Sequence, residues 1–198
     1  MKLGIIGAGH IGQSFAGHAL KAGYEVILSA QDINKVKDLA LQLGKGASAG
    51  SVSDAANADI VFLSIPFSSV EQATADIDWK NKTVIDATNA VTMPDIKLID
   101  TGGKNSTEIV QGYLKGAKIV KAFNTIPAAL MRADPKVNEG ERVLFYSGDD
   151  EEANKKVSEI IESFGFSGIY LGKIAEGGLL QQLIIGSLSL NNLVKYPL

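Results

Sequence analysis

The stretch Lys2–Gly12 reads K-L-G-I-I-G-A-G-H-I-G, and it decides the fold. Its apolar first half is typical of a short buried strand. Gly7, Gly9 and Gly12 follow in the spacing G-x-G-x-x-G, and an apolar helical pattern then runs to a stop at Gly23. A strand, a glycine turn and a helix in this order predict the first βα unit of a Rossmann-type sheet.

In such a loop the first glycine permits a tight turn, the second lets the backbone approach a pyrophosphate, and the third lets helix and strand pack closely. The free N–H groups and the positive dipole end of the helix then face the phosphates. The alternative is a glycine-rich turn without a ligand, which the flanking strand and helix disfavour. We therefore predict dinucleotide binding by Gly7, Ala8, Gly9, His10, Ile11 and Gly12.

The end of the second strand indicates which dinucleotide binds. An NAD-specific protein usually has Asp or Glu about 20 residues after the glycines. This chain has Ser29, Ala30 and Gln31 there, and its first carboxylate, Asp32, is typical of a helix cap. Small polar residues leave room for a 2′-phosphate that Lys35 or Lys37 would neutralise, so we predict NADP. The alternative for Lys35 is a solvated helix face.

Composition excludes several functional classes. The net charge of the 198 residues is −3, without the basic cluster that nucleic-acid binding requires. With no cysteine and only two histidines, we expect neither disulfides, nor a thiolate nucleophile, nor a metal site. No signal peptide or membrane-spanning run is visible, so we expect a cytoplasmic protein with no membrane partner.

Strand and helix patterns alternate along the rest of the chain. Helices are expected from Asp32 to Gly44, from Ser53-Asp54 to Ala58, and over 107–114. Strands are expected near 46–50 and at 59–65, 82–86 and 117–123. This order predicts an α/β fold with a doubly wound, mostly parallel sheet, whose ligand lies at the carboxyl ends of the strands.

The last third predicts a further strand–helix–strand–helix stretch. Strands are expected at 142–146 and 167–171, and a final helix from Ala175 to about Leu193. Asp149–Glu152 would suit a helix start better than a metal or catalytic cluster, because acidic side chains complement the helix dipole. No linker interrupts the chain, so we expect a single domain over 1–198 with a strand–helix extension over about 140–198.

Several stretches in order resemble the family of F420-dependent NADP oxidoreductases. They are Gly7–Gly12, Ser64–Phe67, Val120–Ala128, Ser147–Glu151, and Leu171-Gly172 with the last helix. The same stretches are similar to the cytosolic reductase domain of the STEAP metalloreductases, which passes electrons from NADPH to a flavin.

This resemblance implies hydride transfer between NADP(H) and a stacked flavin-like ring, F420, FMN or FAD, without a side chain acting as acid, base or nucleophile. It implies a homodimer and an acceptor pocket built from the Asn89–Thr107 loop, the Asn124 loop and the last helix. Archaeal members have Ser-Arg where this chain has Ala30-Gln31, and His where it has Asn124. The implied contacts of the nicotinamide half are Ser64, Ile65, Pro66, Asn89, Ala122, Asn124, Ile126 and Pro127.

Three interpretations of function stay open. The first is the oxidoreductase, in which the Asn124 amide would bond a ring carbonyl; alternatively Asn124 ties down its own loop. The second is a non-catalytic NADP(H)-binding sensor or regulatory subunit. The third is a dehydrogenase of small alcohols or acids, which requires a proton donor such as Lys121 or Tyr146. We rank this last, because Lys121 inside a strand suits a structural role better.

Overall fold

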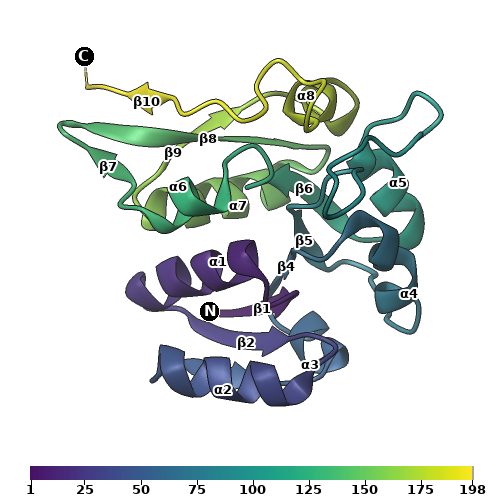
Figure 1. Ribbon diagram of the computed structural model, residues 1–198, viewed down its shortest axis with the longest axis vertical. Helices are drawn as coiled ribbons and strands as arrows, with labels where there is room; N and C mark the ends of the chain where they lie inside the picture. Colours follow the sequence, from purple (N-terminus) through teal and green to yellow (C-terminus); the bar gives the residue numbers. More distant parts are fainter. Residues whose placement is uncertain (198) are drawn as a thin grey trace.

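The apolar strands around the glycine loop pair side by side into a parallel sheet. A computed structural model describes residues 1–197 (Figure 1) and orders these strands β3-β2-β1-β4-β5-β6. Their bounds are β1 (Lys2–Ile6), β2 (Glu25–Ser29), β3 (Ala47–Ala49), β4 (Ile60–Leu63), β5 (Thr83–Asp86) and β6 (Lys118–Ala122). The order reverses between β1 and β4, and this reversal is where ligands bind in open α/β sheets.

The sheet continues beyond β6 with a change of direction. The long strand β8 (Gly140–Gly148) runs antiparallel to β6, and it also pairs with β7 (Lys136–Val137), β9 (Ser167–Tyr170) and β10 (Val194–Lys195). The N-terminal half of the chain therefore lies at one end of the sheet and the C-terminal third at the other, as the colours of Figure 1 show. The expected mostly parallel, doubly wound sheet is confirmed.

Helices cover both faces of the sheet. One face packs against α1 (His10–Lys21), α2 (Ile33–Leu43), α6 (Ala128–Arg132) and α7 (Glu151–Ser163). The other packs against α3 (Val52–Ala56), the 3₁₀ turn η1 (Phe67–Ser69), α4 (Val70–Thr74), α5 (Ser106–Tyr113) and the start of α8 (Ile174–Gln181). No helix within residues 1–197 has the length and apolar character that crossing a membrane requires.

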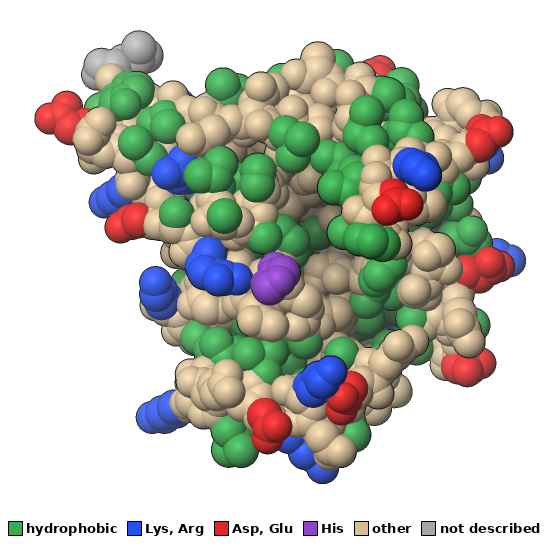
Figure 2. All heavy atoms as spheres, in the orientation of Figure 1, with side chains coloured by type: hydrophobic (Ala, Val, Ile, Leu, Met, Phe, Trp, Pro, Cys, Tyr) green, Lys and Arg blue, Asp and Glu red, His purple; other side chains and the backbone are tan. Residues whose placement is uncertain are grey.

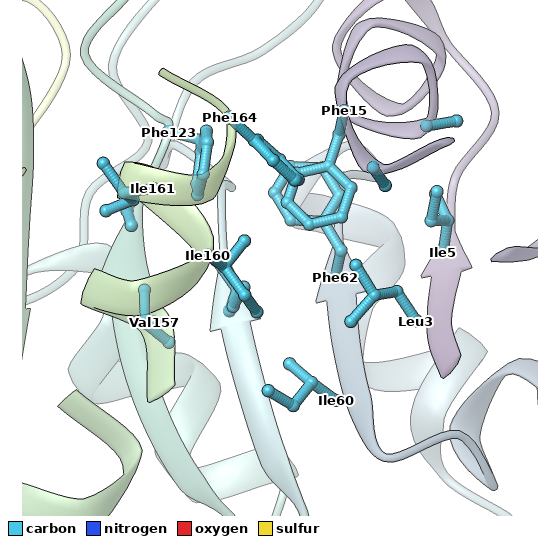
Figure 3. Packing of buried hydrophobic residues seen from close by; sticks show 14 of the residues in the cluster. Leu3, Ile5, Phe15, Ile60, Phe62, Phe123, Val157, Ile160, Ile161 and Phe164 are labelled. Carbon is cyan, nitrogen blue, oxygen red and sulfur yellow. The ribbon is translucent and has the colours of Figure 1, made fainter. Parts of the chain in front are cut away.

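The central strands β1, β4, β5 and β6 are largely buried on both faces because helices cover the sheet on both sides. On β4, Ile60 and Phe62 enter one core and Val61 and Leu63 the other. An aromatic cluster fills the larger core (Figure 3): Phe15 of α1 stacks on Phe62 with ring centroids 3.9 Å apart. Phe123 and Phe164 meet Phe15 edge-on at 5.3 and 5.1 Å. These contacts hold α1 against β4, the strand next to β1 in the sheet.

Three helices begin where a polar side chain caps the free backbone N–H groups of the first turn. Asp32 caps α2 by accepting from the backbone N–H groups of Asn34 and Lys35, as predicted. Asp150 caps α7, which confirms the acidic run as a helix start. The third helix begins earlier than expected, because Ser51 caps it in a reciprocal capping box with Asp54.

The expected final helix from Ala175 to about Leu193 is wrong. Helix α8 ends at Gln181, and the chain continues in turns with positive φ at Ile184 (77°) and Leu190 (59°). Gly186 folds back so closely that a Cβ there would lie 2.4 Å from the carbonyl oxygen of Leu180. The spacing of apolar residues after Gln181 fits a helix, but this segment forms a loop that folds back on the end of α8.

A buried histidine ties α1 to α6. The His18 Nε2 lies 2.6 Å from the carbonyl oxygen of Met131, and burial lowers the pKa of His18. The unfolded chain therefore binds a proton at a higher pH than the folded chain does. We expect the free energy of unfolding to fall as the pH drops from about 6.5 toward the lowered pKa of folded His18, by at most about 1.4 kcal/mol per pH unit. Below that lowered pKa, His18 is protonated in both states and its contribution no longer changes with pH. Urea unfolding at pH 7.5 and 5.5 measures this.

His18→Gln is the matched control for this expectation, because a glutamine amide still donates to Met131 and does not titrate. The variant is expected to show a flatter stability profile between pH 7.5 and 5.5. The carboxylates with lowered pKa, such as Asp54 and Asp150, lose their contribution only at lower pH. Identical profiles for the two proteins would contradict the assignment.

Candidate functional site

The loops after β1, β4, β5 and β6 surround a cleft of about 440 Å³ at the carboxyl ends of the strands. Figure 2 shows this face hollowed near its middle, with apolar side chains around the hollow. Its volume falls within the range of small-molecule sites, about 300–1,000 Å³. The lining residues are Gly9, His10, Ile11, Ser64, Ile65, Pro66, Phe67, Ala87, Thr88, Asn89, Val91, Met93, Ile96, Phe123, Asn124, Ile126, Pro127, Ala128, Leu183 and Leu190.

The glycine loop forms one end of the cleft. Gly7 has φ +108°, and a Cβ on it would lie 2.4 Å from the carbonyl oxygen of Ser64. A Cβ on Gly12 would lie 2.0 Å from the carbonyl oxygen of Gly7, so a side chain at either position would separate α1 from the strands. The Ser64 hydroxyl donates to the same Gly7 oxygen over 2.8 Å and holds the loop to β4. The two glycines are thus required by packing alone.

Gly9 differs from these two glycines. It is the N-cap residue of α1, and a Cβ on it would meet no atom of residues 1–197 within 4 Å. Within residues 1–197 no side chain caps α1, and the first turn of this helix carries no acidic residue. The helix thus presents free N–H groups and its positive dipole end to open space beside Gly9, which is the environment that an anionic phosphate group requires.

The end of β2 lies next to this loop, since the Gly7 N–H donates to the carbonyl oxygen of Ser29 over 2.9 Å. Ser29 is fully buried, and its hydroxyl donates to the carbonyl oxygen of Ile5 over 3.1 Å. Its side chain is therefore engaged with the strand end. Gln31 and Lys35 are exposed, and the Lys35 ammonium lies 3.7 Å from the Asp32 carboxylate.

A buried ion pair supports the floor of the cleft. The Lys121 Nζ lies 3.8 Å from Asp86 Oδ2, and both side chains are fully buried. Lys121 also donates to Ser106 Oγ (2.8 Å), Thr107 Oγ1 (3.0 Å) and the carbonyl oxygen of Thr88 (3.1 Å). Burial lowers the pKa of Lys121, and the charge of Asp86 opposes this shift. With every donor engaged inside the fold, Lys121 is a structural residue and not a proton donor to substrate.

An amide network joins the C-terminal segment to the cleft. The Asn124 Nδ2 donates to Asn89 Oδ1 (3.0 Å) and to the carbonyl oxygen of Gln181 (2.8 Å), and its Oδ1 accepts from Gln181 Nε2 (3.2 Å). Gln181 is fully buried and also accepts from the Ser147 hydroxyl at 2.7 Å. The Asn124 amide is therefore satisfied within the protein, by groups of Asn89 and Gln181 rather than by the backbone of its own loop.

The cleft gathers ten of the sequence-predicted site residues from four loops: Gly9, His10, Ile11, Ser64, Ile65, Pro66, Asn89, Asn124, Ile126 and Pro127. Ala122 does not join them, because it is fully buried in the core under the sheet. Tyr146 lies outside the lining as well, with its ring 5.4 Å from that of Tyr170. Neither Ala122 nor Tyr146 therefore faces the cleft.

Sequence reasoning did not single out Thr88, Met93, Ile96, Leu183 and Leu190, although they line the cleft. The loop around Met93 was expected to contribute as a whole, and its apolar side chains in an otherwise polar loop were the available signal. Leu183 and Leu190 had no such signal, because their spacing fitted a helix. Only the turn after Gln181 brings them to the cleft.

Comparisons with known proteins agree with this arrangement. Residues 2–90 match the family described as NADP oxidoreductase, coenzyme F420-dependent. A hypothetical protein of Sinorhizobium meliloti of known structure is 39% identical, with 98% of this chain and 96% of that chain covered and a TM-score of 0.91. A protein of Arthrobacter named as a candidate F420-dependent NADP-reductase is 26% identical, with 88% and 86% covered and a TM-score of 0.75.

The metalloreductase STEAP3 of Rattus norvegicus is 24% identical over 177 residues. That match covers 88% of this chain, which spans about a third, 34%, of the length of that curated relative. The match over residues 2–90, the glycine loop and the shared fold lead to one conclusion: the chain belongs to the coenzyme F420-dependent NADP oxidoreductase family.

Proposed function

We propose that the protein is an NADP(H)-dependent reductase that exchanges a hydride with a flavin or deazaflavin ring bound in the cleft. The observation that carries the proposal is the uncapped start of α1 beside Gly9, with open space where a Cβ would project. The family description and the cleft at the reversal of strand order support it. When bound, NADPH supplies a hydride from its nicotinamide ring: a C–H bond breaks, its electron pair and proton pass to the acceptor, and the acceptor takes a second proton from water.

The chain contributes binding, orientation and exclusion of water. The backbone of Gly9 and His10 would hold the pyrophosphate, and Arg132, whose Nη2 lies 3.5 Å from His10 Nδ1, adds a positive charge at the same end. Ser64, Ile65 and Pro66 would flank the nicotinamide, since they follow β4 at the reversal of strand order. The amide network of Asn89 and Asn124 keeps the opposite loop in place. Positioning of two rings is sufficient for this reaction.

Calorimetric titration of the purified chain with NADPH and NADH tests the cofactor, and NADPH oxidation with F420, FMN or FAD tests the acceptor. We expect NADPH to bind more tightly than NADH and at least one of these rings to be reduced. Failure of both dinucleotides to bind would refute the proposal at its first step.

One substitution tests where the 2′-phosphate binds. Gln31→Arg is expected to tighten NADPH binding about tenfold and to leave NADH binding unchanged, because a guanidinium forms charge-assisted hydrogen bonds with a phosphate. Gln42→Arg adds the same charge near the other end of α2 and is the matched control. The 2′-phosphate does not bind at the end of β2 if Gln31→Arg changes NADPH and NADH affinity equally. The same conclusion follows if Gln31→Arg and Gln42→Arg change NADPH affinity equally.

A second candidate function is that of an NADP(H)-binding sensor without catalysis of its own. The observation that favours it is chemical: within residues 1–197, the side chains that line the cleft include no Asp, Glu, Lys or Tyr to act as a general acid or base. Hydride transfer between rings does not need such a group either, so turnover distinguishes the two functions. Tight NADPH binding with no oxidation by any ring acceptor would favour the sensor.

A further inference from the structure

Gln181 is the last residue of α8, which lies against β8 (Figure 1), and its side-chain amide is buried between three parts of the chain. Its Oε1 accepts from the Ser147 hydroxyl of β8 over 2.7 Å. Its Nε2 donates to Asn124 Oδ1 (3.2 Å) and to the carbonyl oxygens of Phe145 (3.2 Å) and Lys121 (3.4 Å). The residue is fully buried, so water cannot replace these partners. One side chain thus fixes the end of α8 to β6, β8 and the loop after β6.

The orientation of this amide determines the orientation of two others. Because Ser147 donates to its Oε1, Gln181 presents its Nε2 to Asn124, which presents its Oδ1 in return. The Asn124 Nδ2 therefore donates to Asn89 Oδ1 over 3.0 Å, and the Asn89 Nδ2 donates to the carbonyl oxygen of Asn124 over 3.1 Å. An inverted Gln181 amide would place oxygen against oxygen at Asn124. Ser147 and Gln181 thus set the direction of both asparagine amides.

Gln181 also places the C-terminal wall of the cleft. Beyond it the chain turns, the Leu183 N–H donates to Asn89 Oδ1 over 3.4 Å, and the Leu190 N–H donates to the carbonyl oxygen of Thr125 over 2.9 Å. Leu183, Leu190 and Asn89 line the cleft, whereas Gln181 does not. Leu190 has φ 59°, a conformation that costs free energy for leucine and persists only where the surroundings enforce it. The anchors at both ends of this segment therefore hold its shape.

The glycine loop is held by other bonds. Its polar links run to β2 and β4, because the Gly7 N–H donates to the carbonyl oxygen of Ser29 and the Ser64 hydroxyl donates to the carbonyl oxygen of Gly7. Within residues 1–197, none of the bonds of the Gln181 amide reaches these residues. A change at Gln181 can therefore alter one side of the cleft and leave the proposed phosphate end intact.

We propose that Gln181 is a positioning residue for the reduction of the ring acceptor, and that it acts through Asn124, Asn89 and the two leucines. This inference rests on the proposed function and concerns the side of the cleft opposite the glycine loop. The Gln181 amide transfers neither a proton nor an electron. It holds the wall at the distance that stacking of the acceptor on the nicotinamide requires, because a displacement of about 1 Å is costly in such reactions.

Gln181→Met tests the amide, since methionine keeps the length of the side chain and removes its hydrogen bonds. The acceptor is FMN or F420, whichever the unsubstituted protein reduces faster with NADPH. We expect the KM for this ring to rise about tenfold, while the Kd for NADPH measured by calorimetry stays within about twofold. A purely structural defect would reduce the amount of active protein, which lowers the apparent kcat and leaves KM unchanged.

Gln182→Met is the matched control. Gln182 is adjacent in sequence and 4% exposed, but within residues 1–197 its Oε1 makes no hydrogen bond. We expect this variant to leave both the acceptor KM and the Kd for NADPH unchanged. Any effect common to the two variants measures the exchange of a glutamine for a methionine in this segment, and the difference between them measures the hydrogen bonds of Gln181.

Hydrogen exchange gives a readout that needs no acceptor. In Gln181→Met we expect the backbone amides of Leu183 and Leu190 to exchange at least about tenfold faster, whereas the amide of Gly7 keeps its protection. Ser147→Ala removes the hydroxyl that donates to Gln181 Oε1, from a residue outside the cleft lining. We expect it to raise the acceptor KM and the two exchange rates by about threefold, and it decides the question if Gln181→Met does not fold.

The outcomes separate this inference from the proposed function. Ring reduction with an unchanged KM in Gln181→Met, or with equal changes in Gln181→Met and Gln182→Met, would overturn the role of Gln181 alone. A Kd for NADPH that rises as much as the acceptor KM would also overturn it, because the effect would then extend to the whole site. An unsubstituted protein that binds NADPH and reduces neither ring would refute the proposed function and this inference together.

Discussion

Replacing Asp86 with alanine is expected to lower the free energy of unfolding by about 3–5 kcal/mol, because it leaves the buried ammonium of Lys121 without its counter-ion. Both side chains are fully buried, 3.8 Å apart. Asp86 also accepts from the Thr107 hydroxyl at 2.6 Å and from the Thr88 N–H at 2.9 Å, and both groups would lose that bond. Urea unfolding monitored by circular dichroism measures the loss.

The deficit of Asp86→Ala is expected to depend on pH. Burial lowers the pKa of Lys121, and removing Asp86 takes away the charge that opposes this shift. The folded variant then loses its proton at a lower pH than the unfolded chain, so its stability rises with pH across that interval. We expect a smaller deficit at pH 9.5 than at pH 7, because a neutral amine needs no counter-ion.

Two controls separate the buried pair from a general charge effect. Asp95→Ala breaks an exposed ion pair with Lys97 and is expected to change stability by less than about 1 kcal/mol. The double variant Asp86→Leu, Lys121→Met removes both buried charges and is expected to recover much of the loss. A deficit below about 1 kcal/mol in Asp86→Ala would show that the pair contributes little to the fold.

The buried pair of Asp86 and Lys121 shows which features of the fold the sequence predicts and which it does not. The strands β5 and β6 were predicted from their apolar runs, and a lysine inside one of them indicated a structural role. The partners of Lys121 come from β5, the loop after it and the start of α5, and the most distant of them in sequence is Asp86, 35 residues away. Periodicity reports which residues are buried, but it does not report which distant side chains meet.

The same limit explains the errors at the C-terminus. Leu183 and Ile184 fitted a helical spacing that continues from Leu179 and Leu180, and no proline interrupts it before Pro197. The helix ends because Gln181 enters the protein and bonds Ser147 and Asn124, which are 34 and 57 residues away. Those long-range bonds outweigh local helix propensity. They also engage the side chain of Asn124, for which the sequence left open a contact with a ring and a role in its own loop.

For the glycine loop, in contrast to the C-terminal segment, the sequence pattern predicted the local geometry correctly. The three glycines have different surroundings, however. A methyl group added to Gly7 or Gly12 would lie 2.4 or 2.0 Å from a backbone oxygen, whereas one added to Gly9 would face open space. A side chain at Gly7 or Gly12 would therefore disturb packing and binding together. Gly9 is the position where binding can be tested apart from folding.

Gly9→Ala is expected to weaken NADPH binding about 100-fold while the melting temperature stays within about 2 °C of the unsubstituted protein. Alanine can adopt the backbone conformation of Gly9, φ −75° and ψ −171°, and the added methyl meets no atom of the described part of the chain within 4 Å. It would occupy the space where the pyrophosphate approaches the first N–H groups of α1. Losing one or two charge-assisted hydrogen bonds, about 1.5–3 kcal/mol each, accounts for a change of this size.

Gly17→Ala is the matched control, because it adds the same methyl in the middle of α1, again with no atom of the residues that the structure describes within 4 Å. It is expected to raise stability by about 0.5–1 kcal/mol through helix propensity and to leave NADPH affinity unchanged. Calorimetry with NADPH and thermal unfolding of both variants give the two quantities separately. If Gly9→Ala binds NADPH as tightly as Gly17→Ala does, the start of α1 is not the phosphate site and the proposed position of the cofactor is wrong. If Gly9→Ala alone loses affinity at constant stability, the open space beside Gly9 is the space that the phosphates fill.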